Sequence, residues 1–103
     1  MRRMAAIPVL FALSISGTPA AFAADAAKGG ELARLWCAAC HLVAPDQERV
    51  PTVAPPFGTI GKRPGFNVRA LSQSMLAPHP QMPDRGLSRE QAEDIAAYIA
   101  TLR

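Results

Sequence analysis

The chain has 103 residues, enough for one domain, and its 11 lysines and arginines against 8 acidic residues give a formal net charge of +3. It contains no run of basic residues of the kind that follows the phosphates of a nucleic acid. Length and charge therefore indicate one small domain and exclude nucleic acid as an expected partner.

The N-terminus has the pattern of a secretory signal peptide. Arg2 and Arg3 precede an apolar run at residues 5–15, and small residues follow that run. The apolar run is too short for a membrane-spanning helix, which needs about 20 apolar residues. A small-x-small triplet ends at Ala23 and predicts cleavage after that residue, with an uncleaved anchor as the alternative.

Cleavage there divides the chain into a signal peptide at 1–23 and a mature domain at 24–103. We expect the mature domain in a bacterial periplasm, without stable insertion in the membrane. It has 80 residues and nearly balanced charge, because loss of Arg2 and Arg3 leaves nine basic against eight acidic residues. A single hydrophobic core is marginal at that size, so small domains usually add a disulfide, a metal or a cofactor.

A five-residue motif offers that additional stabilisation: Cys37-Ala38-Ala39-Cys40-His41. Two thiols three residues apart on a helical turn lie on one side of the chain, where they can add to the two vinyl groups of one haem. His41 can then direct its imidazole to the iron as the proximal ligand. The motif therefore predicts one covalently attached haem c, with its iron, per chain.

Other uses of the same residues are less well supported. Exported cysteines often form a disulfide, but Cys37 and Cys40 are close together and directly followed by a histidine. A thioredoxin-like dithiol needs strands around the pair, and the mature chain has no strand pattern. A structural zinc site needs four ligands, and only His79 remains to join the three of the motif.

The first half of the mature domain is expected to form a helix followed by a long loop. Residues 26–39 have a helix-favouring composition, with Leu32, Leu35 and Trp36 at helical spacing. Five prolines between residues 43 and 65 exclude a regular helix or a central strand there. We therefore expect this segment to wrap around the domain.

A second helix is predicted from the N-cap candidate Asn67 to about Leu76. Its apolar face contains Val68, Leu71 and Met75 at helical spacing. Prolines after this segment end the helix.

The last helix has the clearest start signal. Ser88 is an N-cap candidate, and Gln91 three residues later completes a capping box. The helix is expected to continue to the C-terminus. Its buried stripe, with Tyr98 at the edge, is Ala92, Ile95, Ala96, Ile99 and Leu102.

The order of these features resembles the class I cytochrome c family over residues 29–102. The resemblance implies an all-α fold of about three helices, with proline-rich loops wrapped around one haem. In that family the first and last helices pack together at a glycine before the haem motif and an aromatic residue of the last helix. Gly29 and Tyr98 match these positions, although Gly29 could also belong to an N-terminal loop.

Three side chains are candidates for the second axial ligand of the iron. We choose Met82, because it precedes Pro83 in a proline-stiffened segment that resembles the ligand loop of the family. Met75 lies on the apolar face of its helix, which indicates a core residue. His79, three residues before Met82, is the main rival.

The resemblance also implies residues around the haem. In the family a proline carbonyl accepts the Nδ1 proton of the proximal histidine, and Pro55 matches that proline, preceded here by alanine in place of glycine. Arg63, or Lys62, resembles the basic residue that pairs with a haem propionate, with a solvated charge as the alternative. Trp36 and Phe57 are expected to pack against the haem.

These assignments predict an electron carrier and not an enzyme. An iron ligated by both His41 and Met82 has no open position for a substrate, and the thioether favours the ferrous state. We expect a monomer that exchanges single electrons with redox protein partners. Two other classes stay open: a haem protein with an open or bis-histidine iron, and a dedicated subunit of a periplasmic dehydrogenase or oxidase.

Overall fold

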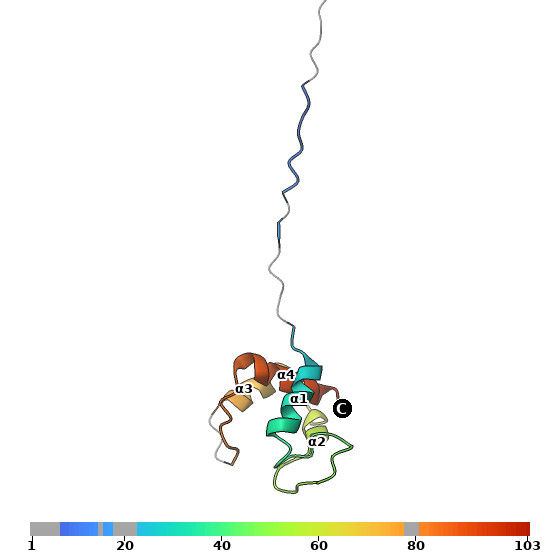
Figure 1. Cartoon of the computed structure of the whole chain (residues 1–103), viewed down its shortest axis with the longest axis vertical. Helices are drawn as coiled ribbons and strands as arrows, with labels where there is room; N and C mark the ends of the chain where they lie inside the picture. The colour runs from blue at the N-terminus through green and yellow to red at the C-terminus, as the bar shows by residue number, and fades with distance from the viewer. Residues whose placement is uncertain (1–6, 15, 18–22, 78–80) are drawn as a thin grey trace, which may run out of the picture.

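A computed structural model describes residues 7–14, 16–17, 23–77 and 81–103 of the chain. The described part contains four helices and no strand: α1 is Ala26–Trp36, α2 is Phe57–Gly61, α3 is Val68–Leu76 and α4 is Arg89–Ala100. The four helices lie together at one end of the molecule (Figure 1). This architecture confirms the expected all-α fold.

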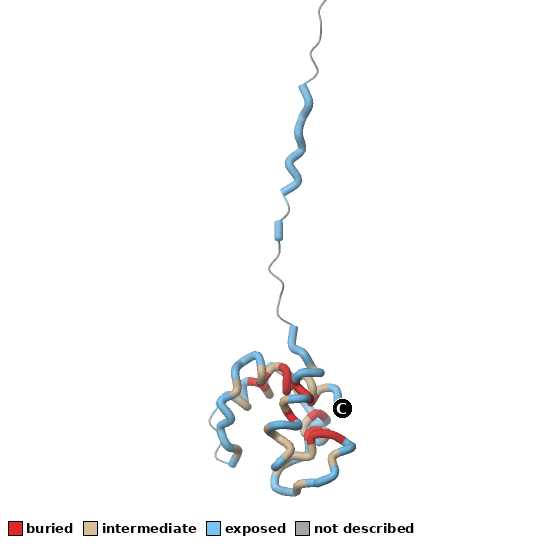
Figure 2. The backbone as a smooth tube through the Cα atoms, viewed as in Figure 1, coloured by how far each residue is buried: buried red, intermediate tan, exposed pale blue. Residues whose placement is uncertain are grey.

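Residues 7–14 run away from the helices, with neither helix nor strand (Figure 1). These residues are exposed (Figure 2), and they include the large hydrophobic residues Phe11 and Leu13. Among the described residues, no helix combines the length and the apolar character needed to cross a membrane.

Three of the four helices begin at a side-chain cap. Asn67 caps α3, and Ser88 forms a reciprocal capping box with Gln91 at the start of α4. Both predicted caps are therefore confirmed. Asp25, which the sequence analysis did not single out, caps α1. Each cap satisfies a backbone N–H that has no partner within its helix.

Helix α2 lies in the segment where no regular helix was expected, so that prediction was wrong. The helix begins directly after Pro56, which occupies its N-cap position, and ends at Gly61, before the next proline. Proline is tolerated at a helix start because the N–H that it lacks has no helical partner there. The prolines bound this short helix and do not interrupt it.

Helix α1 ends earlier than predicted, and its apolar face is only partly as predicted. The helix ends at Trp36, and the following residues to 40 form turns. Leu32 packs against the core half-buried, and Trp36 is half-buried at the cavity described below. Leu35, placed by its spacing on the apolar side, is 75% exposed. The buried residues of α1 are the small ones Gly29, Gly30 and Ala33, because α4 lies too close to this face for larger side chains.

The close approach of α1 to α4 therefore depends on glycine residues, which have no side chain. A Cβ at Gly29 would overlap the backbone carbonyl of Asp94 in α4, and one at Gly30 would lie 3.0 Å from the Tyr98 ring. The buried Asp94 carboxylate also accepts a hydrogen bond of 2.8 Å from the backbone N–H of Asp25. The resemblance correctly placed Gly29 and Tyr98 at this crossing, and Gly30 is the residue that accommodates the aromatic ring.

The core lies between α4 and the elements that cover it (Figure 2). Of the predicted α4 stripe, Leu102 is only half-buried and four residues are buried: Ala92, Ile95, Ala96 and Ile99. From outside α4 the buried apolar residues are Ala33, Val43, Ala44 and Phe57. Leu71 and Met75 of α3 pack against this core half-buried, whereas Leu76 is 43% exposed and so does not belong to the buried face.

Candidate functional site

The two cysteines lie on one helical turn that directly follows α1. The Cys37 N–H donates to the Ala33 carbonyl at 2.9 Å, and the Cys37 carbonyl accepts hydrogen bonds from the N–H groups of Cys40 and His41 at 3.1 and 2.9 Å. The two cysteines form no disulfide with each other, and both are half-buried. The turn therefore holds both sulfurs and the imidazole on one short, hydrogen-bonded piece of backbone.

The His41 ring is held by a backbone acceptor. Its Nδ1 lies 2.6 Å from the Pro55 carbonyl oxygen, and because a carbonyl only accepts, Nδ1 carries the proton. The ring also lies against Phe57, with centroids 5.1 Å apart and planes tilted by 52°. Nε2 is consequently the nitrogen that remains available as a metal ligand.

Backbone hydrogen bonds tie the segment that carries Pro55 to the cysteine turn. The Ala54 N–H donates to the Cys40 carbonyl at 3.2 Å, and the Phe57 N–H donates to the Leu42 carbonyl at 2.9 Å. These bonds flank Pro55 on both sides. The alanine that replaces the glycine of the family therefore does not prevent the approach of the proline carbonyl to His41.

A cavity of about 400 Å³ lies beside this turn, within the size range of small-molecule and cofactor sites. Its walls come from the cysteine turn, the loop and helix α2, helix α3, and the segment that leads into α4. The lining residues are Trp36, Cys37, Cys40, His41, Val53, Ala54, Pro55, Phe57, Ile60, Arg63, Leu71, Ser74, Met75, Gln81, Met82, Pro83, Arg85, Leu87 and Ile99.

Both candidate methionines line this cavity. Met82 lies on the irregular segment before α4 and is half-buried, and Met75 projects from α3 and also packs against the core. His79, the rival of Met82, lies outside the described residues. The structure thus brings two thioethers to the cavity wall, one on a loop and one on a helix.

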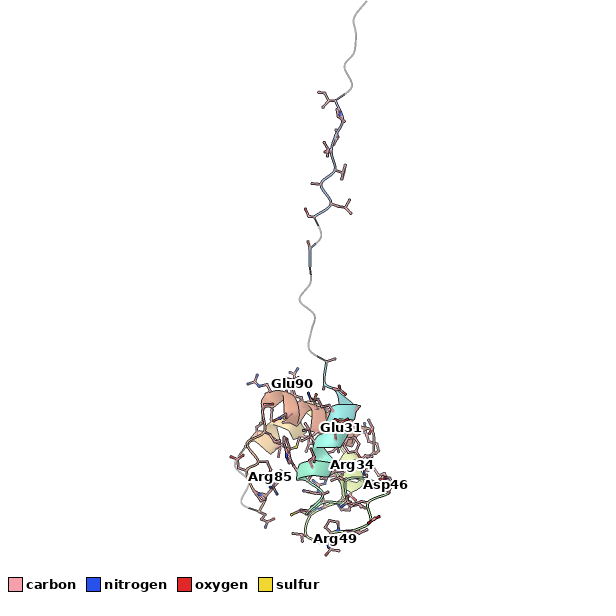
Figure 3. All side chains as sticks on the ribbon, in the orientation of Figure 1. Glu31, Arg34, Asp46, Arg49, Arg85 and Glu90 are labelled. Atoms are coloured by element: carbon pink, nitrogen blue, oxygen red, sulfur yellow. The ribbon has the colours of Figure 1, made fainter. Side chains whose placement is uncertain are left out.

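Two arginines line the same cavity. Arg63 was expected there, whereas Lys62 caps the end of α2 and is not part of the lining. Arg85 was not predicted as a site residue, because an arginine in an irregular segment carries no motif. Figure 3 places Arg85 on the side of the helices away from Asp46.

The thiol of Cys37 has a raised pKa. Burial raises its pKa to about 11, against an opposing lowering by the nearby Arg85 charge. A thiol in such surroundings stays protonated at neutral pH, because an apolar environment disfavours the thiolate. The site around Cys37 is therefore suited to a neutral sulfur, and a thioether is a neutral sulfur.

The lining matches the chemistry of an attached haem. It contains two thiols on one turn, an imidazole with a free Nε2, a thioether on a loop and apolar walls. Among the described residues, no three His, Cys, Asp or Glu side chains converge on one point, as a zinc site would require.

Comparison with known proteins identifies the family. The family model described as cytochrome c matches residues 26–103, which is most of the chain. The chain belongs to the cytochrome c family. Cytochrome c-552 of Bradyrhizobium diazoefficiens is 47% identical over 88 residues, which cover 85% of each chain. No solved structure matches the chain.

Membership in the cytochrome c family establishes the cofactor and the general function. The chain has a covalently bound haem c with its iron, as the cysteine motif predicted. It is an electron carrier and not an enzyme, and its partners are redox partners.

Proposed function

We propose that the chain is a periplasmic one-electron carrier with a six-coordinate haem. Cys37 and Cys40 form the thioether bonds, and His41 and Met82 are the axial ligands of the iron. The observation that carries this proposal is the hydrogen bond from His41 Nδ1 to the Pro55 carbonyl, which leaves Nε2 available on a residue that lines the same cavity as Met82. The leader pattern at 1–23 supports export to the periplasm.

Each residue of the site has a defined task in electron transfer. The haem supplies a reversible one-electron couple between ferric and ferrous iron. Pro55 fixes the tautomer and the orientation of the His41 ring and increases its basicity. The Met82 thioether favours the ferrous state. With His41 and Met82 both holding the iron, no coordination position would be open for a substrate, so the protein would act by electron transfer alone.

The cavity walls limit the contact between the cofactor and water. Phe57 and Ile99 are buried, and Trp36, Ile60 and Leu71 are half-buried. Such walls strengthen the electrostatic interaction between a bound cofactor and nearby charges and dipoles, because the dielectric constant there is lower than in water.

We propose that the protein works as a monomer that meets its partners briefly, through a small interface of under about 1,200 Å².

The Met82→Ala substitution tests the ligand assignment. We expect the variant to keep its covalent haem, bind carbon monoxide in the ferrous state and have a lower reduction potential, because the thioether no longer occupies and stabilises the ferrous iron. Carbon monoxide difference spectra and potentiometry measure both effects.

Met75→Ala is the matched control, because it removes a second thioether that lines the same cavity from helix α3. This variant should not bind carbon monoxide. If Met75→Ala binds carbon monoxide and Met82→Ala does not, the ligand is Met75 and the assignment is wrong. If neither variant binds it, His79 becomes the candidate ligand.

A further inference from the structure

The side chain of Gln47 forms the centre of a hydrogen-bond cluster next to the cysteine turn. Its Oε1 accepts from the Val43 N–H at 2.9 Å. Its Nε2 lies within hydrogen-bond distance of three carbonyl oxygens, those of Ala38 at 3.1 Å, His41 at 3.2 Å and Arg49 at 2.9 Å. Because the amide nitrogen has two hydrogens, one of them is shared between two of these carbonyls. One amide group thus connects the loop that contains it to the turn that carries both cysteines.

Two of these contacts, to the carbonyls of Ala38 and His41, reach beyond the loop that contains Gln47. The loop already has a local turn bond, from the Gln47 N–H to the Ala44 carbonyl at 3.3 Å. Ala38, in contrast, lies between the two cysteines, nine residues earlier. An amide is suited to this position because it accepts and donates through one planar group.

Val43, two residues after His41, is held from both sides. Gln47 binds its N–H, and the Tyr98 hydroxyl of α4 donates to its carbonyl oxygen at 2.6 Å. Its side chain is 1% exposed and belongs to the core. The backbone just after His41 is therefore anchored to the packed helices.

We propose that Gln47 is a positioning residue for the proximal ligand, a role that rests on the proposed ligation by His41. By holding the carbonyls of Ala38 and His41, it fixes the backbone from which the His41 ring projects. The ring then stays 2.6 Å from the Pro55 carbonyl. A strong Nδ1–H bond makes the imidazole more basic toward iron and favours the ferric state.

The Gln47→Met substitution tests this role, because it keeps the length of the side chain and removes its hydrogen bonds. The holoprotein should show a higher reduction potential, since a loosened His41 donates its Nδ1 proton less strongly. In the reduced state the His41 Nδ1 proton should exchange with water at least about fivefold faster, because the loss of even one net hydrogen bond of about 1 kcal/mol from the closed state gives that factor. Potentiometry and proton NMR provide the two readouts.

Gln73→Ala is the control, because Gln73 is exposed on α3 and lines a separate cleft that contains none of the residues of the cysteine turn. It should leave both readouts unchanged. Gln47→Glu keeps an acceptor for Val43 and loses the donors, so proton exchange should be faster in this variant as well. This second variant tests the role if Gln47→Met yields no holoprotein.

The outcomes separate this inference from the proposed function. If His41 ring signals in the reduced wild-type protein lack the large ring-current shift of an axial ligand, the ligation proposal fails. If those signals are present but neither Gln47 variant exchanges faster than the wild type, the positioning role is overturned. Equal changes in Gln73→Ala would overturn it too, because the effect would not be specific to Gln47.

Discussion

Arg63 and Arg85 are the charged side chains that line the described walls of the haem cavity, and no acidic residue lines them. The Arg85 charge acts on Cys37, where it lowers the thiol pKa against the larger opposite effect of burial. Arg85 is therefore within electrostatic reach of Cys37, which we propose as one of the two haem attachment points. A cation near the iron favours the ferrous state, because that state has one positive charge less.

The Arg85→Gln substitution should accordingly lower the reduction potential. The shift should shrink as ionic strength rises, because Arg85 is exposed and its charge is screened by salt. Arg69→Gln is the matched control, since Arg69 lines a separate cleft between α3 and the start of α4. Potentiometry at low and high salt measures the shift. An equal shift in both variants would mean that only the net charge matters.

The close approach of α1 to α4 determines where the cysteine turn lies. The turn follows α1 directly, and α1 is fixed against α4 through Gly29, Gly30 and the bond from Asp25 to Asp94. An exposed ion pair between Arg34 and Asp46, 2.9 Å long, also joins α1 to the following loop (Figure 3). Exposed pairs of this kind contribute little to stability. The glycine contact is therefore the main determinant.

Gly29→Ala should destabilise the oxidised holoprotein by about 1–3 kcal/mol, because the added methyl overlaps the Asp94 carbonyl and forces the helices apart. Gly58→Ala in α2 is the control. The nearest atom to a Cβ at Gly58 is the Leu102 carbonyl oxygen, at 3.6 Å, so the methyl fits there. Alanine in a helix should then stabilise by up to about 1 kcal/mol. Denaturant unfolding of both variants measures the difference, and equal stability would contradict the close-approach account.

The sequence was informative for elements whose signals are local. Asn67 and Ser88 marked helix starts because a cap acts within three residues. Leu35 was misplaced because spacing alone does not reveal that a neighbouring helix lies too close for large side chains. Helix α2 was missed because its bounding prolines were interpreted as a continuous break.

For the candidate site too, the sequence indicated the residues that belong to a motif and missed those that do not. The cysteine motif indicated the turn and its haem, and the resemblance led to Pro55. Gln47 and Arg85 had no such signal, because their partners are set by how the loop and the segment before α4 fold back on the cysteine turn. Contacts of this kind depend on the tertiary structure and follow no spacing rule.

For the molecule as a whole, the apolar core of the described residues is small. The largest fully buried side chains are Ile95, Ile99 and Val43, and several other core residues are alanines. A domain of this size with such a core is marginally stable by itself. We therefore expect the covalently attached haem to contribute much of the packing that holds the helices together.

Replacing both proposed attachment residues, Cys37→Ser with Cys40→Ser, should remove the covalent haem and most of the stable fold. We expect a weaker helical circular dichroism signal and no cooperative thermal transition like that of the wild type. A double variant without haem that melts like the wild type would show that the protein part is sufficient for folding.

The most direct test is the absorption spectrum, in oxidised and reduced forms, of the protein produced with residues 1–23 in a bacterial host and recovered from the periplasm of that host. The account predicts a haem that stays attached after denaturation and, in the oxidised form, the weak long-wavelength band of sulfur-to-iron charge transfer. That band would establish thioether ligation, and its loss in Met82→Ala would assign it to Met82. An attached haem without the band would contradict the proposed ligation and would point to His79 or an open iron.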